Sequence, residues 1–487
     1  MNKRAGICYI VIFMILCLVP FAGMIFFSSN TTTENKTLAT FPEFVEEGSV
    51  NLNFCDELSD YFEDHFAFRQ ALVNTDAEIQ SNVFGVSNVD TVIVGSDGWL
   101  YYSDTLDDYL GQDLMSERSI YNAAHNLLLM QEYVEECGAE FTVAIAPNKN
   151  SLYGENMPYY YSKKASDEKN VYNLMKEMEN QGVNYVDLFT AFGNENEILY
   201  LKRDSHWNGK GAVLAYNEIL NSLYIEHDFL DTVNVLRTKT EVGDLGSMIY
   251  PVTAEPEWNY FYQYDADYSY VTDTESVEDA WIETENEEGE ASLLMLRDSF
   301  GNTLLPLMAN TFEKGYFSKT VPYSLEAYMD ECEPDVVISE KAERSIDEYA
   351  GEAPLMQGVE TNISADVENV NEDSKGNATS CMVEESENDI SYWLVSGTID
   401  EDTAQQRTDI YIRLSDEKGT TKTFEAFLVT TDASDYGYAL YLSKDFITEN
   451  FSGSEEKITV DVITEDDGNA VCVYTEDMNF AVSTDEE

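Results

Sequence analysis

The chain has 487 residues, in which 27 lysines and arginines face 93 aspartates and glutamates, for a net charge of −66 at pH 7. A surface this acidic repels nucleic acid and anionic lipid, so the charge balance excludes both as partners. The length predicts two or three domains, and a hydrophobic share of 44% excludes a wholly disordered chain.

The N-terminal segment is strongly apolar. Residues 7–27 carry no charge, and as a helix they would rise about 31 Å, enough to cross a bilayer. Lys3 and Arg4 precede the segment, which by the positive-inside rule places the N-terminus in the cytoplasm. We therefore predict a cytoplasmic tip and transmembrane signal anchor over residues 1–28, in the cell membrane, with the remaining chain outside the cytoplasm. A cleaved signal peptide is the alternative, although no clear Ala-x-Ala site follows.

Residues 29–84 are predicted to form a stalk and a packing helix. The first part, to about residue 50, is polar and irregular. Over residues 54–82 the apolar side chains recur at helical spacing, at Phe54, Leu58, Tyr61, Phe62, Phe66 and Leu72. This spacing predicts a helix that packs on the domain that follows.

Residues 85–350 alternate between strand and helix patterns. Strands are predicted at 91–94, 99–102, 141–146, 183–189, 292–296 and 336–338, with helices at 117–136, 167–180, after 208 and from 299 to about 312. Such alternation predicts an α/β domain built on a parallel sheet. Residues 225–290 interrupt the pattern and are interpreted as an insertion near the site.

The C-terminal part differs in pattern. Residues 351–378 are predicted to be a linker by their composition. Residues 379–487 contain short alternating segments at 392–396, 409–413, 423–427, 438–442 and 458–462. Strands of this length and spacing predict a β-sandwich accessory domain.

Two short motifs contain the groups needed for acyl transfer. The first is Asp204-Ser205-His206-Trp207 and the second is Arg297-Asp298-Ser299-Phe300-Gly301. A serine hydroxyl becomes nucleophilic when an imidazole accepts its proton, and a carboxylate orients that imidazole. Ser299 follows a predicted strand and opens a helix, where free N–H groups can hold an oxyanion. Asp298 is assigned to helix capping in either case. Capping is the competing interpretation for Ser299, and a polar capping loop is the competing one for Asp204 and His206.

Together the motifs resemble the DHHW proteins, relatives of the alginate O-acetyltransferases in the SGNH hydrolase superfamily. Further segments match in order between about residues 40 and 350: 61–69, 98–102, 146–153, 243–246 and 334–338. The resemblance implies an SGNH-like three-layer sandwich with a parallel sheet. It also implies a triad of Ser299 as nucleophile, His206 as base and Asp204 as its orienting group.

The chain departs from the ordinary SGNH pattern at two places. Arg297 stands where ordinary members have glycine, and the usual Gly-x-Asn-Asp block is not evident. The oxyanion hole is therefore assigned to the backbone N–H of Ser299 and to Asn148. The expected substrate-binding residues are Lys149 and Tyr153 after one strand end, together with Trp207 and Arg297. No cluster has metal-ligand spacing, so neither a metal nor a cofactor is expected.

These observations predict a membrane-anchored, extracytoplasmic serine acyltransferase that O-acetylates a surface polysaccharide. A multi-pass membrane acyltransferase is the implied acyl donor. Two alternatives remain open: a carbohydrate esterase with the same triad, and a non-catalytic glycan-binding or assembly protein.

Overall fold

The computed structural model describes residues 3–23, 39–46, 49–227, 230, 233–363, 367–369, 379–401, 404–451, 457–466 and 468–480. The first helix, α1, covers Lys3–Gly23. Within this described part, no helix combines the length and apolar character needed to cross a membrane. The membrane helix expected over residues 7–27 is therefore not found; α1 ends at Gly23, and residues 24–27 lie outside the described part.

The predicted helix over 54–82 is divided into two. The two helices are α2 (Phe54–His65) and α3 (Arg69–Ile79). A two-stranded ribbon of β1 (Val45–Glu46) and β2 (Ser49–Val50) precedes α2, and a π-helical turn, Gln80–Phe84, follows α3. The chain breaks at Phe68, whose φ of 64° lies in the left-handed region, which a continuous helix cannot contain. As expected, α3 packs on the following domain: Ala77 shares a small core with Val92 and Leu100.

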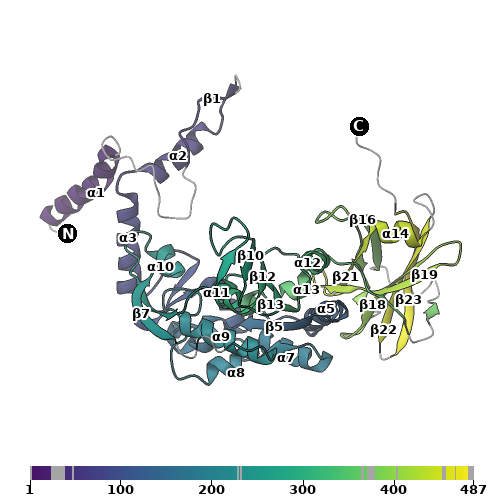
Figure 1. The fold of residues 1–487 in the computed structure, drawn as a ribbon. Helices are drawn as coiled ribbons and strands as arrows, with labels where there is room; N and C mark the ends of the chain where they lie inside the picture. Colours follow the sequence, from purple (N-terminus) through teal and green to yellow (C-terminus); the bar gives the residue numbers. More distant parts are fainter. Residues whose placement is uncertain are drawn as a thin grey trace.

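The centre of the molecule is a seven-stranded sheet in the order β6-β5-β13-β11-β12-β10-β9 (Figure 1). The five strands from β6 to β12 run parallel; β10 pairs antiparallel with β12, and β9 pairs antiparallel with β10. In chain order the strands are β5 (Glu140–Ala146), β6 (Tyr185–Val186), β9 (Tyr268–Tyr270), β10 (Trp281–Asn286), β11 (Ser292–Leu296), β12 (Lys314–Ser318) and β13 (Val336–Ala342). Because parallel strands end at one edge, the segments after β5 and β11 meet there.

Helices cover both faces of this sheet. One core contains Leu294 and Leu296 of β11, with residues of α5 (Glu117–Glu136), α7 (Asn170–Gln181), α12 (Leu325–Cys332) and α13 (Glu348–Gly351). The other contains Leu293 and Met295, with residues of α8 (Leu188–Gly193), α9 (Gly209–Ser222) and α11 (Gly301–Thr311). Successive residues of β11 thus enter opposite cores, as alternation along a strand requires, and the domain has three layers.

Three parts of this domain differ from the sequence prediction. The strands β3 (Val92–Val94) and β4 (Leu100–Tyr102) pair as a separate hairpin outside the main sheet. The strand expected over 183–189 is only β6, because the Asp187 side chain accepts a bond from the Thr190 N–H and starts α8. The 225–290 segment adds β9 and β10 to the main sheet, forms the hairpin of β7 (Asn234–Glu241) and β8 (Glu257–Gln263), and includes α10 (Asp244–Ile249).

The C-terminal region is rich in strands. One sheet has the order β14-β19-β18-β22-β23-β15 and another the order β16-β17-β21-β20. The strands are β14 (Glu360–Thr361), β15 (Glu368–Asn369), β16 (Ser380–Glu385), β17 (Tyr392–Thr398), β18 (Asp409–Ser415), β19 (Thr421–Glu425), β20 (Phe427–Val429), β21 (Gly437–Ser443), β22 (Ile458–Asp466) and β23 (Asn469–Met478), with helix α14 (Lys444–Asn450). Side chains from both sheets share one core, as in a sandwich.

The segment predicted as a linker is partly ordered. Leu355 and Met356 are buried in the core that includes α5, and Gln357 forms a bridge with Tyr441. Residues 364–366 and 370–378 lie outside the described residues.

Candidate active site

Ser299 lies in a short loop at the carboxyl end of β11. The loop is fixed by Asp298, which accepts bonds from Phe300 N–H at 2.8 Å and from Ala342 N–H, at the end of β13, at 2.7 Å. The Asp298 carboxylate therefore ties the loop to the neighbouring strand as well as to the turn that enters α11. This arrangement holds the half-buried Ser299 at the edge of the sheet.

His206 lies in the loop that leads into α9. The Asn208 side chain caps that helix by accepting from Lys210 N–H at 2.9 Å and Gly211 N–H at 3.1 Å. Trp207 is almost completely buried, and its indole N–H donates to Thr303 Oγ1 of α11 at 2.5 Å. The histidine loop is thus fixed to the helix that begins beside Ser299.

The three residues of the two motifs form one hydrogen-bonded line. His206 Nε2 lies 2.8 Å from Ser299 Oγ, and His206 Nδ1 lies 2.7 Å from Asp204 Oδ1. Asp204 also accepts the backbone N–H of His206 at 2.9 Å and of Asp244 at 3.0 Å. Both distances along the line are within hydrogen-bond range, so the imidazole can take a proton from the serine while the carboxylate orients it.

The pKa values of His206 and Asp204 are shifted in opposite directions. Burial alone would lower the pKa of His206, but the hydrogen bond and charge of Asp204, with the charge of Asp244, outweigh it and raise that pKa. Burial alone would raise the pKa of Asp204, but the bonds from His206 and the backbone N–H of Asp244 lower it. Asp204 thus stays ionised, and His206 is a stronger base than a free imidazole.

A second carboxylate, that of Asp244, lies beside the histidine. It accepts Ser205 N–H at 2.8 Å and Ser205 Oγ–H at 2.5 Å, and its Oδ2 lies 3.8 Å from His206 Nδ1. The preceding Gly243 permits this approach, because a Cβ there would lie 2.2 Å from Arg203 O. The sequence match over 243–246 included Asp244 without indicating its role.

Comparison with known proteins agrees with this architecture. Residues 92–288 match the family described as SGNH hydrolase-like domain, acetyltransferase AlgX. This part of the chain is similar to an SGNH hydrolase-like domain. The match covers less than half of the chain, includes Asp204 and His206, and ends before Ser299. The resemblance to the DHHW proteins and alginate O-acetyltransferases is thereby confirmed, as is the α/β fold class of the domain.

Solved structures resemble the chain at low identity. A DHHW family protein from Eubacterium siraeum is 18% identical, with a TM-score of 0.41 and coverage of 53% of this chain and 93% of its own. PatB1 of Bacillus cereus is 17% identical, with a TM-score of 0.43 and coverage of 54% and 99%. The O-acetyltransferase domain of Pseudomonas putida AlgJ is 16% identical, with a TM-score of 0.37 and coverage of 53% and 92%. No curated protein matches the chain.

Lys149, which was expected to bind substrate, is buried in the α/β domain. Its buried ammonium donates to the carbonyls of Leu201, Lys202 and Asp204, at 3.2, 3.1 and 2.5 Å. Burial lowers the pKa of Lys149 to about 8. The lysine therefore holds the loop that leads to the Asp204–His206 pair.

The other three residues expected to bind substrate are also engaged within the protein. Arg297 is buried and donates to Asn302 Oδ1 and to backbone carbonyls at 277 and 279. Tyr153 accepts the Leu199 N–H with its hydroxyl, 2.8 Å away, and its ring contacts Trp99. Trp207 lies in the core, as described above. Each of these side chains thus contacts other parts of the protein, and substrate binding by any of them stays a prediction.

Two donors are available for an oxyanion. The Ser299 backbone N–H meets no acceptor among the described residues. Asn148, which follows β5 at the same edge of the sheet, is 1% exposed, and neither its side-chain oxygen nor its nitrogen has a partner in that part of the chain. Glu343 holds it in place by accepting Asn148 N–H at 2.7 Å. The unpaired, buried side-chain amide of Asn148 is therefore free to donate to the negative oxygen that develops on a substrate carbonyl.

One further residue near the site escaped sequence analysis. The Arg344 guanidinium lies 5.5 Å from the Phe300 ring centre and 5.6 Å from that of Tyr102. Its positive charge opposes protonation of His206 and so acts to lower that pKa. Arg344 follows β13, and only the folding of this strand beside β11 brings it to the serine; no motif marks it.

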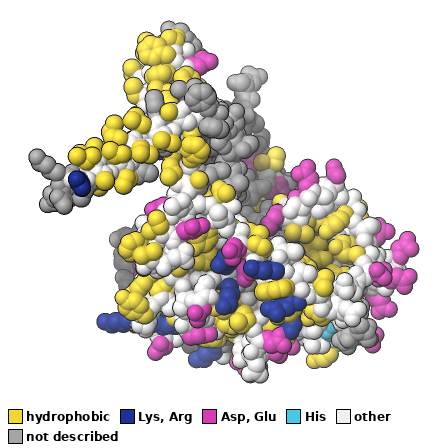
Figure 2. All heavy atoms as spheres, turned by 90° about the vertical axis from the view of Figure 1, so that its left-hand side faces the viewer, with side chains coloured by type: hydrophobic (Ala, Val, Ile, Leu, Met, Phe, Trp, Pro, Cys, Tyr) yellow, Lys and Arg dark blue, Asp and Glu magenta, His cyan; other side chains and the backbone are white. Residues whose placement is uncertain are grey.

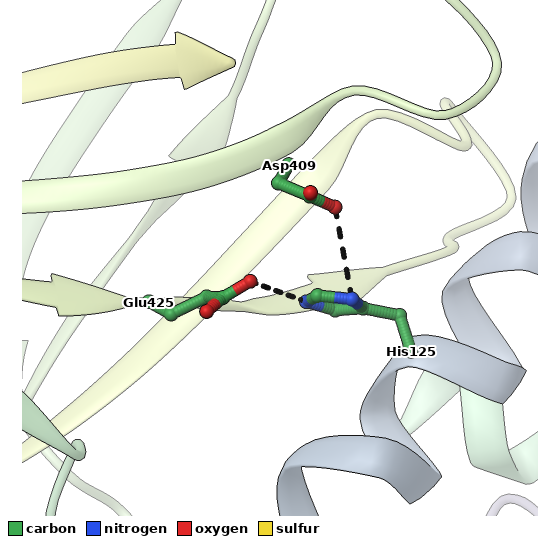
Figure 3. Close-up of side chains that lie close together, drawn as sticks. All are labelled: His125, Asp409 and Glu425. Carbon is green, nitrogen blue, oxygen red and sulfur yellow. Dashed lines mark ion pairs between the residues drawn. The ribbon is translucent and has the colours of Figure 1, made fainter. Parts of the chain in front are cut away.

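Two groups of side chains within the described residues have donor atoms close enough to hold a metal ion. In the group Asp204, His206 and Asp244, the oxygens already accept backbone and hydroxyl hydrogens. The other group lies between α5 and the C-terminal strands (Figure 3). There, His125 points one ring nitrogen at Asp409, 3.7 Å away, and the other at Glu425, 3.4 Å away. Because the two nitrogens face different carboxylates, this imidazole bridges the pair.

Proposed function

We propose that this chain is a serine O-acyltransferase that acetylates hydroxyl groups of a glycan through an acyl-Ser299 intermediate. The observation that carries the proposal is the continuous line from Asp204 through His206 to Ser299, with 2.7 and 2.8 Å between successive atoms. The match of residues 92–288 to the acetyltransferase AlgX domain supports the reaction class. A merely structural loop would not need an oriented imidazole directed at a half-exposed hydroxyl.

The residues divide the reaction into two proton-balanced steps. Ser299 Oγ attacks the carbonyl carbon of an acetyl ester while His206 Nε2 takes its proton, and the oxyanion is held by the Ser299 N–H and Asn148. When the ester bond breaks, the imidazolium returns this proton to the departing alkoxide. A sugar hydroxyl then attacks the acetyl-serine, giving its proton to His206, and Ser299 regains a proton as its bond to the acetyl group breaks. If water attacks instead, the same residues act as an esterase.

The cellular setting is also a proposal. The uncharged 7–27 segment behind Lys3 and Arg4 supports export of the remaining chain, where a surface polysaccharide would be the acceptor and a multi-pass membrane acyltransferase the donor. Protease added to intact cells should digest the domain, and full protection would contradict export.

The proposed nucleophile is tested with p-nitrophenyl acetate as acyl donor. We expect the full chain to release p-nitrophenol and to gain the mass of one acetyl group on Ser299. Ser299→Ala should lower turnover at least about a thousandfold and abolish the adduct. Ser162→Ala, at an exposed serine, is the matched control and should retain full activity. Equal turnover by Ser299→Ala and the control would exclude Ser299 as nucleophile.

A further inference from the structure

The contact between α5 and the C-terminal strands encloses three ionisable side chains that the proposed reaction does not use. His125 projects from α5, whereas Asp409 and Glu425 project from the paired strands β18 and β19 (Figure 3). The His125 side chain is 4% exposed, and those of Asp409 and Glu425 are 28% and 21% exposed. Acidic side chains on the face shown in Figure 2 (magenta) stand at the surface, where water screens them. The three at this contact are mostly enclosed, so their charges depend on partners at the contact.

Negative charge accumulates at this contact because of the strand register. Asp409 is opposite Glu465 in the next strand, β22, and Glu425 is opposite Tyr411. Residues 409 and 411 are two apart on β18, so all four side chains lie on one face of the sheet. Burial raises the pKa of Glu425 to about 8, and three nearby carboxylates add to this: Asp409, Glu132 and Glu465. Such a group of carboxylates is stabilised by a cation bound among them.

Arg118, a basic neighbour of His125, is not paired with these carboxylates. Its guanidinium is buried and donates to the backbone carbonyl of Thr408 at 2.7 Å. Within the described part of the chain it forms no ion pair with the Asp409 or Glu425 carboxylate. This arginine therefore leaves the negative charge of the contact available to another cation.

The imidazole of His125 presents a free nitrogen to Glu425. Nδ1 lies 3.7 Å from Asp409 Oδ1, so a proton on Nδ1 faces that carboxylate. Burial lowers the pKa of His125, which favours the neutral ring with a lone pair on Nε2. Nε2 is buried and has no hydrogen-bond partner among the described residues, although it points toward Glu425 Oε1. A buried lone pair aimed at a carboxylate oxygen allows both atoms to ligate one ion.

The distance between these two atoms fits a shared metal ion better than a hydrogen bond. His125 Nε2 and Glu425 Oε1 are 3.4 Å apart. Hydrogen bonds between nitrogen and oxygen usually span about 2.7–3.2 Å. Two ligands that are each about 2.1 Å from a zinc ion, at the tetrahedral angle, lie about 3.4 Å apart. Donor atoms of Asp409, His125 and Glu425 all lie within 4.8 Å of one another, so Asp409 is also within reach of the ion.

We infer that His125 Nε2 and the Glu425 carboxylate bind a zinc-class divalent ion, which fastens α5 to the C-terminal strands while Asp409 orients the imidazole. A carboxylate on the second ring nitrogen is the usual partner of a metal-bound histidine. The nitrogen ligand selects Zn²⁺ over Mg²⁺ or Ca²⁺, which take oxygen ligands. Water would complete the coordination, since both carboxylates are partly exposed. The site is separate from the catalytic residues and does not depend on the proposed function.

Equilibrium dialysis of the full chain, treated with EDTA and then held in excess magnesium, measures the site with ZnCl₂ as the probe. We expect one zinc ion per chain, with a Kd of about 1 μM or below at pH 7.5. Glu425→Gln and His125→Ala should each weaken this binding about tenfold or more. Glu417→Gln, at an exposed carboxylate, is the matched control and should bind within about twofold of wild type. Wild-type affinity in Glu425→Gln would overturn the inference.

His206→Ala tests for binding at the other group, that of Asp204, His206 and Asp244. This variant should keep the zinc ion that Glu425→Gln loses. The reverse result would place the ion at the catalytic loop and overturn the inference.

Thermal unfolding gives a second readout, because an ion that fastens the two parts stabilises the folded chain. Saturating zinc should raise the Tm by at least about 3 °C in wild type and His206→Ala, and hardly at all in Glu425→Gln. Each variant is compared with itself without zinc, so a change in its metal-free stability cancels. Glu425→Gln keeps the shape of the side chain and decides the test even if His125→Ala does not fold. An equal rise in wild type and Glu425→Gln would contradict the site.

Discussion

At the scale of single residues, the basicity of His206 depends on more than its hydrogen-bonded partner. Asp204 orients the ring, whereas Asp244 lies on the same side and adds a second negative charge 3.8 Å from Nδ1. Arg344 opposes both. Because the pKa of His206 is raised, the neutral imidazole that catalysis needs predominates only at a pH above the usual pKa of histidine. Activity should therefore rise with pH through a pKa above about 6.5.

Asp244→Asn should move this rise to lower pH. The variant removes one negative charge near His206 but keeps an oxygen for the Ser205 N–H, so the pKa of His206 should fall. The measurement is kcat/KM for p-nitrophenyl acetate from pH 5 to 9, with the exposed Asp167→Asn as control. An unshifted profile with lower kcat would mean that Asp244 acts through loop geometry alone.

At the scale of elements, the catalytic pair lies in a loop rather than in a helix or strand, and buried groups define the shape of that loop. Lys149, from the segment after β5, donates hydrogen bonds to three backbone carbonyls of residues 201–204. Gly246 N–H of α10 donates to Arg203 O at 2.8 Å from another side. Sequence analysis placed Lys149 at a strand end correctly, but it could not show that the following loop folds over the ammonium. Burial of these carbonyls makes their donor necessary.

Lys149→Met should therefore reduce catalysis without contacting the reacting atoms. Loss of the donor removes this hydrogen bond from the Leu201 and Asp204 carbonyls, while Lys202 O still accepts Leu100 N–H at 2.9 Å. We therefore expect kcat to fall about ten- to a hundredfold with KM little changed. Because the pKa of Lys149 is about 8, wild-type kcat should also decline above that pH, and the variant should lack this decline. Lys163→Met, at an exposed lysine, is the control. A variant with wild-type kcat and pH profile would contradict the positioning role.

At the scale of the whole molecule, α5 contacts both the central sheet and the C-terminal strands. It packs on the central sheet, and Asn126 in its middle exchanges hydrogen bonds with the backbone of Leu428 in β20, at 2.8 and 2.9 Å. Next to it, burial raises the pKa of Glu425 to about 8 and lowers that of His125. The C-terminal region is thus joined to the α/β domain by buried polar contacts, where the sequence predicted an accessory domain behind a linker.

The Glu425 carboxyl makes stability depend on pH. Its pKa is higher in the folded than in the unfolded chain, so its contribution is fully present below about pH 4.5 and is lost as pH rises through about 8. Glu425→Gln mimics the protonated form and should stabilise the protein by on the order of 2 kcal/mol at pH 8, and hardly at all at pH 4.5. Thermal unfolding at both values checks this, with the exposed Glu417→Gln as control. Equal melting shifts at the two pH values would contradict it.

Much of the architecture followed from periodicity, because buried parallel strands and amphipathic helices differ in spacing. The bounds predicted for β11 and α5 match the structure. The strands β3 and β4 were predicted around a turn, but their separation from the main sheet and the break at Phe68 were not, since both depend on distant contacts. Asp204, His206 and Ser299 were found in sequence because their two motifs together resemble those of the DHHW proteins, whereas each motif alone also fits a helix cap.

The amino-acid sequence by itself determined the α/β alternation, the acidic charge and the three side chains of the candidate triad, which are local properties of the chain. Only the tertiary structure decided which residues lie beside those side chains and influence their charge and orientation. Asp244 and Arg344 reach His206 from distant segments, and Lys149, Arg297 and Trp207 lie inside the domain. A side chain's exposure and partners depend on which segments fold over it, and those segments are distant in sequence.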